Sequence, residues 1–323
     1  MPKQTLPKET LFVVTTVSNP IRWDSRTNRA RAAIEAWTAE PNVHVTVVEI
    51  LYGDRGPELD DLASDRVLHI SAHASTTAWS KECALNVGLT RLSPMARYIG
   101  FFDADILWRK PGWATEILHA LQLYPVVQPW SHCYDLGPNG EHLATHTSFA
   151  RIYCNGGNVV PRFDPNSLSL TNSPYPYPHP GYAWCWRRNI LDRVGGLFEL
   201  GGCGSGDHHM ALALIGKAKA SVPTGVNEDF REILEVWQSR ALRQVNRKIG
   251  YVPGTIEHPF HGRKRDRGYN SRWWLFLKHG FDPLEDLKKN TYGIIEWAGN
   301  KPELEREWML YLRGREEDAN VTT

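Results

Sequence analysis

The amino-acid sequence predicts an α/β fold with a mostly parallel central sheet flanked by helices. Over residues 1–130, short apolar or β-branched runs alternate with helical patterns, which is the order of βαβ units with right-handed crossovers. The run at residues 98–105 is apolar almost throughout, as expected of a strand buried on both faces. It ends in two acidic residues, and ligands gather where the strands of such a sheet end.

Seven elements are expected in this N-terminal part. The strands end at turn signals such as Ser18-Asn19-Pro20 and Gly53-Asp54. The helices carry apolar residues at helical spacing, and Pro111 suits the N1 position of the last one. The expected strands are residues 11–17, 43–51, 66–71 and 98–105, and the expected helices are residues 29–37, 79–92 and 112–123.

The pattern changes after residue 130. Residues 131–182 are rich in Asn, Pro, Gly and Ser, and the proline-rich run 174–180 suits neither a helix nor a central strand. Because long loops are functional or disordered and this one is rich in aromatic residues, we expect it to face a substrate. Beyond it we expect helices at 186–194, 206–219 and 228–247, a strand at 249–256, and a helical tail at 271–323 anchored by Trp273, Trp274, Leu275, Trp297 and Trp308.

The composition limits the class of protein. The chain has 323 residues, enough for one large domain or two ordinary ones, and 41% are hydrophobic. Lysine and arginine total 37 against 36 acidic residues, and this net charge of +1 excludes a strongly basic nucleic-acid binder but not a local basic patch. The 13 tryptophans and 12 tyrosines suit either a core or a sugar- or base-binding surface.

The cysteines and the apolar runs indicate a compartment. Five scattered cysteines form no C-x-x-C pair, which argues against a zinc knuckle or a disulfide framework and favours a reducing environment. The N-terminus has no signal-peptide pattern, and no apolar run reaches the roughly 18–20 residues of a membrane span. We therefore expect a cytoplasmic protein without a membrane partner, while its oligomeric state stays open.

The acidic pair Asp103-Ala104-Asp105 is the first candidate site. Alternation along a strand places both carboxylates on one side. They repel each other unless a cation lies beside them, and carboxylate oxygens suit Mg²⁺ or Mn²⁺. Such a pair more often marks a solvated turn, but the apolar flanks favour a metal site here.

Four further segments carry polar groups that are candidates for a site. Lys81 and Asn86 lie on an otherwise apolar helix, where a salt bridge and a capping amide are the simpler interpretation and a place near a donor site is the other. Asp207 follows a glycine-rich stretch at a helix start and suits a cap or a general base equally. His258 and His261 can present two imidazoles to one metal. The basic tract 263–272 suits a solvated face, a phosphate or a nucleic-acid backbone.

Together these segments resemble the GT-A-fold nucleotide-sugar glycosyltransferases, especially family-2-like and galactosyltransferase-like members. The resemblance covers about residues 10–262, and its motifs occur in the family's order. The donor-side motifs are Asn19-Pro20-Ile21-Arg22, similar to a Pro-Phe-Arg nucleotide loop, then Lys81…Asn86-x-Gly88, and Phe102-Asp103-Ala104-Asp105, similar to the F-x-D-x-D metal motif. The later motifs are Gly181–Arg188 with Val194-Gly195-Gly196 on the acceptor side, Gly206-Asp207 at the place of the catalytic base, and His258-Pro259-Phe260-His261 at the place of a Met-x-x-His pair.

The resemblance implies a metal-dependent, inverting glycosyltransferase. Its cofactors would be Mn²⁺ or Mg²⁺ and a nucleotide-diphospho-sugar, with UDP-sugars favoured, and Asp207 would be the base for an acceptor hydroxyl. The metal ligands would be Asp103, Asp105, His258 and His261. The donor would be bound by Pro20, Arg22, Lys81, Asp103, Trp184, Arg263, Lys264 and Arg267.

The resemblance also implies a domain organisation and an acceptor. Residues 1–262 would form the catalytic domain, with a nucleotide-sugar half at about 10–130 and an acceptor half at 131–262, and residues 263–323 would be a basic, helical extension packed on it. The pattern is most similar to uncharacterised bacteriophage glycosyltransferases, which are often linked to sugar addition on hydroxymethylated pyrimidines in DNA. Secreted and Golgi enzymes of similar chemistry carry an anchor, so its absence favours a bacterial or virus-infected cell.

Departures from the family leave alternatives open. Gly206-Asp207 replaces the usual Glu-Asp pair, which leaves the base less defined, and His stands for Met at position 258. A GT-A relic would bind a sugar or nucleic acid without turnover, although the carboxylates are all kept. A sugar-phosphate nucleotidyltransferase shares the sheet type, but residues 18–22 lack the glycines of its phosphate loop. Glycan, lipid-linked saccharide and protein stay open as acceptors beside DNA.

Overall fold

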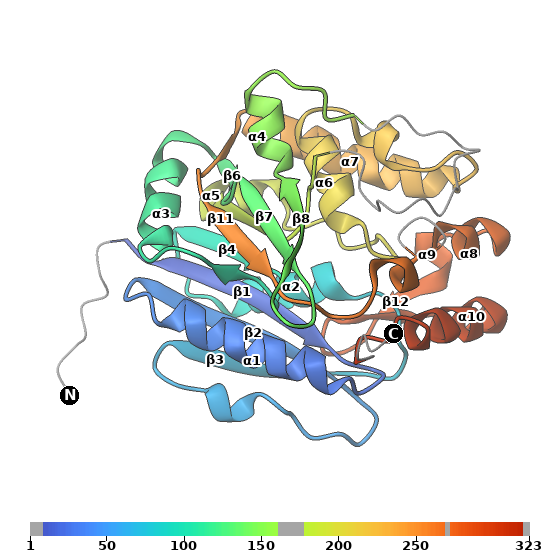
Figure 1. The fold of residues 1–323 in the computed structure, drawn as a ribbon. Coiled ribbons are helices and arrows are strands. Elements are labelled where there is room, and N and C mark those ends of the chain that lie inside the picture. Colours follow the sequence, from blue (N-terminus) through green and yellow to red (C-terminus); the bar gives the residue numbers. More distant parts are fainter. Residues whose placement is uncertain (1–8, 161–177, 269–271, 319–323) are drawn as a thin grey trace.

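A seven-stranded, mostly parallel sheet forms the centre of the molecule (Figure 1). The computed structural model describes residues 9–160, 178–268 and 272–318. From one edge to the other, the strands are β10 (Ile249–Tyr251), β6 (Val126–Gln128), β9 (Ala183–Arg187), β4 (Tyr98–Phe102), β1 (Leu11–Ser18), β2 (Val43–Tyr52) and β3 (Val67–Ala74). β9 runs antiparallel to β4 and β6, and the other pairings in this sheet are parallel. The predicted α/β class is therefore confirmed.

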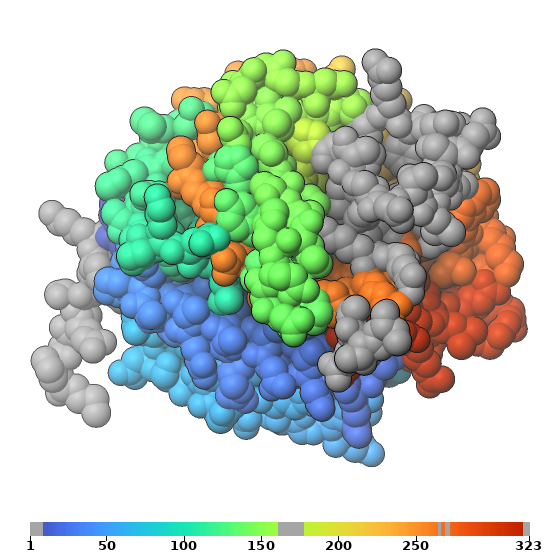
Figure 2. Space-filling view, viewed as in Figure 1, coloured from blue at the N-terminus to red at the C-terminus, as the bar shows by residue number. Residues whose placement is uncertain are grey.

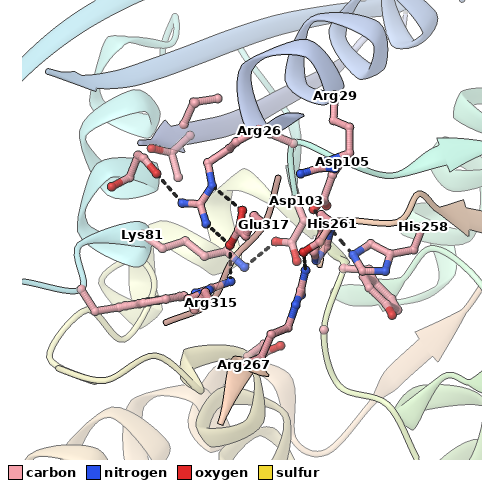
Figure 3. A pocket seen from close by; sticks show the side chains of 18 of the residues that line it. Arg26, Arg29, Lys81, Asp103, Asp105, His258, His261, Arg267, Arg315 and Glu317 are labelled. Atoms are coloured by element: carbon pink, nitrogen blue, oxygen red, sulfur yellow. Dashed lines mark hydrogen bonds and ion pairs between the residues drawn. The ribbon is translucent and has the colours of Figure 1, made fainter. Parts of the chain in front are cut away.

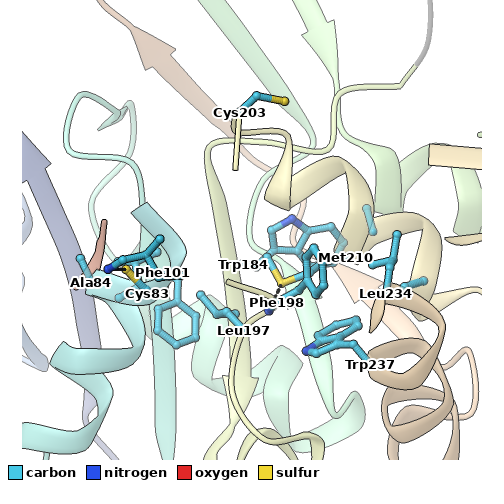
Figure 4. Close-up of a cluster of buried hydrophobic side chains, with 14 of the residues drawn as sticks. Cys83, Ala84, Phe101, Trp184, Leu197, Phe198, Cys203, Met210, Leu234 and Trp237 are labelled. Atoms are coloured by element: carbon cyan, nitrogen blue, oxygen red, sulfur yellow. Dashed lines mark hydrogen bonds between the residues drawn. The ribbon is translucent and has the colours of Figure 1, made fainter. Parts of the chain in front are cut away.

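Helices cover both faces of the sheet, as the alternation of strands and helices requires. One face packs against α1 (Asp24–Thr38) and α3 (Trp113–Leu123). The other packs against α2 (Lys81–Arg91), α5 (Arg188–Val194), α6 (Gly206–Leu214) and α7 (Glu228–Val245). Figure 4 shows part of this second core, where Phe101 and Trp184 of the sheet lie among Leu197, Met210 and Trp237.

The middle and later segments of the chain form a second, four-stranded sheet. Its order is β5 (Leu107–Trp108), β11 (Thr255–His258), β7 (His132–Leu136) and β8 (His142–Thr147). β11 is parallel to β7, and β5 and β8 are antiparallel to their neighbours. Because β5 follows β4 closely, this sheet brings the end of β11 to the residues just after β4. In Figure 2 the β7–β8 hairpin (green) crosses the front of the molecule above the N-terminal segment (blue).

The C-terminal part contains both helices and a hairpin. Its elements are α8 (Arg272–Lys278), α9 (Pro283–Asp286), β12 (Leu287–Lys289), β13 (Ile295–Trp297) and α10 (Pro302–Arg313). The expected helical tail is thus interrupted by the β12–β13 pair. Trp273, Trp297 and Trp308 are buried as expected of anchors, whereas Trp274 is 49% exposed.

Several element boundaries differ from the sequence expectation. Residues 131–182 include β7, β8 and α4 (Phe149–Cys154) rather than a continuous loop, because β7 alternates buried and half-buried residues despite its polar composition. The helix expected at 186–194 begins only at Arg188, because residues 186–187 belong to β9. Trp184 and Trp186 of this strand are buried in the sheet. Pro253-Gly254 divides the expected strand 249–256 into β10 and β11. The run 174–177 lies outside the described residues.

Smaller differences concern where helices and turns begin. α1 begins at Asp24, and α3 begins after Gly112 rather than at Pro111, because Gly112 takes a positive φ of 77° that suits glycine. Short 3₁₀ turns lie at η1 (Asp60–Leu62), η2 (Ala218–Ser221) and η3 (Lys264–Arg267). Within the described part of the chain, no helix has the length and apolar character needed to cross a membrane.

Candidate active site

A cavity of about 220 Å³ opens where β1 and β4 end (Figure 3). β4 stops at Phe102, and the backbone N–H of Asp103 then donates to the Tyr182 carbonyl at 2.8 Å, so the acidic pair turns out of the sheet. The cavity is lined by seven of the residues singled out from the sequence, namely Lys81, Asp103, Asp105, Asp207, His258, His261 and Arg267. Lys81 and Arg267, which are 186 residues apart in the sequence, therefore line one cavity at the predicted edge of the sheet.

Asp105, His258 and His261 form a three-ligand group. One ligand atom from each lies within 4.8 Å of the others. Asp105 Oδ2 is 3.2 Å from His261 Nδ1 and 3.6 Å from His258 Nε2. His261 is buried, and its Nδ1 makes no hydrogen bond within the described residues. A buried imidazole nitrogen without a hydrogen bond beside a carboxylate fits a divalent cation. Two imidazole ligands argue against Mg²⁺, which is bound mainly by oxygen atoms.

Asp135 orients one of these ligands. Its Oδ1 accepts from His258 Nδ1 at 2.9 Å and from the Tyr182 hydroxyl at 3.1 Å, and its Oδ2 lies 2.5 Å from His146 Nε2. This contact leaves His258 Nε2 directed at Asp105, the arrangement in which a second carboxylate fixes a metal-binding imidazole. Burial lowers the pKa of His258, but Asp105 and Asp135 outweigh it and raise the pKa to about 9.

Asp103 is held differently from Asp105. Its Oδ1 forms an ion pair with Lys81 Nζ, at the first turn of α2. Burial lowers the pKa of Lys81, but Asp103 and Glu82 raise it well above its usual range. In the described residues, Asp103 is not part of the three-ligand group. Lys81 thus makes the salt bridge that residue chemistry favoured, and that salt bridge lies inside the cavity.

Asp207 faces the cavity from the first turn of α6. The preceding Ser205 has a positive φ of 64°, and Asp207 Oδ1 accepts from the backbone N–H of His208 at 2.8 Å. A Cβ atom on Gly181 would lie 2.6 Å from Asp207 Oδ2, so glycine there leaves room for the carboxylate. Nearby, Glu82 Oε2 accepts from Trp79 Nε1 at 3.1 Å, and burial raises the pKa of Glu82 to about 7. Asp207 and Glu82, two carboxylates in different environments, therefore line the same cavity.

Arginines from four segments line the rest of the cavity, and we call them the arginine cluster. Figure 3 shows most of them around Asp105 and Glu317. Burial lowers the pKa of Arg29 to about 10, although Asp105 and Glu317 act in the opposite direction. Guanidinium groups gathered at a cavity bind phosphate oxygens well. The cluster comprises Arg26 and Arg29 of α1, Arg267 of η3, Arg272 of α8 and Arg315 after α10.

Three donor-binding residues expected from the sequence do not line the cavity in the described part of the chain, and the side chain of a fourth is not described. Arg22 is exposed with a positive φ of 70°, and the Pro20 carbonyl accepts from Arg55 Nη2 at 3.0 Å. Neither Arg22, Pro20 nor Arg263 is among the described cavity-lining residues. The side chain of Lys264 lies outside the described residues. Trp184 is buried against a small adjoining cavity of about 40 Å³ that Asp207 also lines.

Several residues of this site were not predicted from the sequence. Arg26 and Arg29 are one helical turn apart at the start of the first crossover helix, a spacing that would have placed both on one face. Asp135 is buried in a polar strand that was expected to be a loop. Arg315 and Glu317 lie in a charged C-terminal segment whose composition gives no sign of burial.

No family model matches the chain, and no curated protein matches it. Among solved structures, the chain is similar to residues 1–349 of S. aureus TarS, with 11% identity, a TM-score of 0.43, and coverage of 85% of this chain and 69% of that chain. It is also similar to the mannosyltransferase PcManGT from Pyrobaculum calidifontis in complex with GDP-Man and Mn²⁺, with 14% identity, a TM-score of 0.42, and coverage of 94% and 70%. Because these identities and TM-scores are low, the function is inferred from the residues of the site and not from these structures.

Proposed function

We propose that this protein is a metal-dependent glycosyltransferase of the GT-A type, which moves a sugar from a nucleotide-diphospho-sugar to an acceptor hydroxyl. The observation that carries the proposal is the position of Asp105, His258 and His261 in one cavity with the arginine cluster and Asp207. A divalent cation held by the three ligands would act as a Lewis acid on the leaving diphosphate. UDP-sugars are the favoured donors, as the sequence resemblance implies.

In this proposal each remaining group has one task. The arginine cluster binds phosphate oxygens, and Lys81 pairs with Asp103 at the edge of the donor site. Asp207 takes the proton of the acceptor hydroxyl, whose oxygen then bonds to the anomeric carbon. The bond from that carbon to the diphosphate oxygen breaks on the opposite side, so the nucleoside diphosphate leaves and the configuration inverts. The segment 131–262, which carries Asp207, would form the acceptor half.

Substitution of Asp207 tests the base. We expect Asp207→Asn to lower kcat by about 10²–10⁴-fold, the usual contribution of a general base, with little change in donor affinity. The measurement is sugar transfer together with nucleoside diphosphate release under saturating donor. Asp192→Asn is the matched control, because Asp192 is exposed on α5 outside the cavity. Full transfer activity in the Asp207→Asn enzyme would remove Asp207 from this role.

Metal removal and acceptor choice test the rest of the proposal. Excess chelator is expected to abolish transfer and added Mn²⁺ to restore it.

The proposed acceptor is DNA with hydroxymethylated pyrimidines, as in the bacteriophage enzymes that the sequence resembles. Radiolabelled UDP-sugars offered with such DNA, with unmodified DNA and with simple saccharides distinguish the acceptors. Label on saccharides alone would replace DNA by a glycan acceptor, and donor binding without any turnover would indicate a binding protein.

A further inference from the structure

The end of α10 and the segment after it line the cavity, and this segment returns to the start of α1. Tyr311, Arg315 and Glu317 all contribute to its wall, although they are nearly 300 residues from β1 along the chain. Glu317 is 4% exposed, which is unusual for a carboxylate so close to the end of the described chain. A carboxylate that is buried must be paired to be tolerated.

Glu317 is paired with two members of the arginine cluster. Its Oε1 lies 2.5 Å from Arg26 Nη2 and 2.9 Å from Arg315 Nη2, and its Oε2 accepts from Arg26 Nε at 3.0 Å. Burial would raise the pKa of Glu317, but Arg26 and Arg315 lower it to about 2. Arg26 Nη1 also donates to the Ser18 carbonyl at the end of β1. Glu317 therefore fixes a guanidinium at the edge of the sheet.

The adjoining residue attaches the segment without lining the cavity. The exposed Asp318 accepts hydrogen bonds from the backbone N–H groups of Asp24 and Ser25 at 2.8 and 2.9 Å, in the first turn of α1. A carboxylate is favoured at a helix N-terminus. Asp318 thus anchors the same segment from outside the cavity, and it supplies a control for Glu317.

Charge repulsion inside the cluster gives Glu317 a specific task. The positive charges of Arg26 and Arg267 lower the pKa of both Arg29 and Arg315. The negative charge of Glu317 raises the pKa of both. Asp105, the other favourable carboxylate beside Arg29, belongs to the three-ligand group. Without Glu317, the guanidiniums would lose the carboxylate that holds them together.

We propose that Glu317 is a positioning residue which holds Arg26 and Arg315 at the cavity wall, so that the C-terminal segment completes a site for a diphosphate. This inference rests on the proposed function, because it takes the anion to be the diphosphate of the nucleotide-sugar. The opposite role is a distinct outcome: a carboxylate that merely occupies the phosphate site would compete with the anion, and its removal would tighten binding.

Binding of inorganic pyrophosphate in the presence of Mn²⁺, measured by calorimetry on the full chain, separates these outcomes. We expect Glu317→Gln to raise Kd about tenfold and to raise the KM for a UDP-sugar far more than it changes kcat, while Asp318→Asn stays within about twofold of the wild type. Equal losses in both variants would mean that the segment matters only for folding, and equal or tighter binding by Glu317→Gln would overturn the proposal.

A second variant covers the case in which Glu317→Gln does not fold. Glu317→Asp keeps the charge on a shorter side chain, so we expect several-fold weaker pyrophosphate binding with an unchanged Tm. Binding equal to that of the wild type would overturn the proposal. Failure of the proposed function gives a different result, because the wild type itself would then bind neither pyrophosphate nor a UDP-sugar with Mn²⁺.

Discussion

At the residue scale, the site is built from carboxylates whose surroundings differ. Asp135 accepts from several donors, so its pKa lies well below the usual range, although burial acts in the opposite direction. Glu82 is buried with one hydrogen bond from Trp79 and lies near Asp207, and its pKa rises to about 7. The first carboxylate stabilises a charged arrangement, whereas the raised pKa of the second makes it titrate near neutral pH.

The pKa of Glu82 makes the stability of the protein depend on pH. Its ordinary value is 4.5, so between about 4.5 and 7 the folded protein binds more protons at this site than the unfolded chain does. The contribution of Glu82 to the free energy of unfolding therefore falls as pH rises through that window, by about 3 kcal/mol in total. Glu82→Gln cannot titrate, so relative to the wild type we expect it to gain stability from pH 5 to pH 8. Urea unfolding at several pH values measures this, and a difference that does not vary with pH would contradict the assignment.

At the element scale, the cavity depends on how closely α2 approaches the sheet. A Cβ atom on Gly88 would lie 2.5 Å from Val14 Cγ1 and 3.1 Å from Val48 Cγ2, so only glycine allows this distance. The same helix places Lys81 beside Asp103 at its first turn. The glycine that resembles a family motif in sequence therefore has a packing reason in the structure.

Gly88→Ala should push α2 away from β1 and β2. We expect a loss of about 1–3 kcal/mol in the free energy of unfolding, the usual cost of one extra methyl group in a tightly packed core. Because Lys81 moves with the helix, transfer activity should fall as well. Gly56→Ala is the control, since a Cβ atom at Gly56 would meet no atom within 4 Å. Similar stabilities of the two variants, measured by urea unfolding, would show that α2 is free to shift.

The sequence could predict the elements and site residues that follow strong local patterns. Asp105 and His261 each lie three residues after a strand, Asp207 follows a glycine-rich turn, and all three line one cavity. The β7–β8 hairpin was missed because its strands are polar and partly exposed, so they lack an apolar alternation. Arg315 and Glu317 were missed because their burial depends on a tertiary contact with α1, and nothing local indicates it.

At the scale of the whole molecule, the cavity joins three regions of the chain. The loop after β4 of the central sheet supplies Asp105, the four-stranded sheet supplies His258, and the C-terminal segment supplies Glu317. Binding of one ion to ligands from the first two regions would link their folding. A ligand that binds only the folded state raises the free energy of unfolding in proportion to the logarithm of its concentration.

Mn²⁺ should therefore stabilise the whole fold. At a free concentration 100 times its Kd, we expect a gain of about 2.7 kcal/mol in the free energy of unfolding, because the unfolded chain does not assemble the three ligands. His261→Ala should lose most of this gain, since it removes a buried ligand, whereas His119→Ala should keep it, because His119 is exposed on α3 away from the cavity. Chemical denaturation with and without Mn²⁺ measures both variants. A gain that survives His261→Ala unchanged would place the ion elsewhere, and equal gains from Mn²⁺ and Mg²⁺ at the same free concentration would contradict the bias against Mg²⁺ that two imidazole ligands imply.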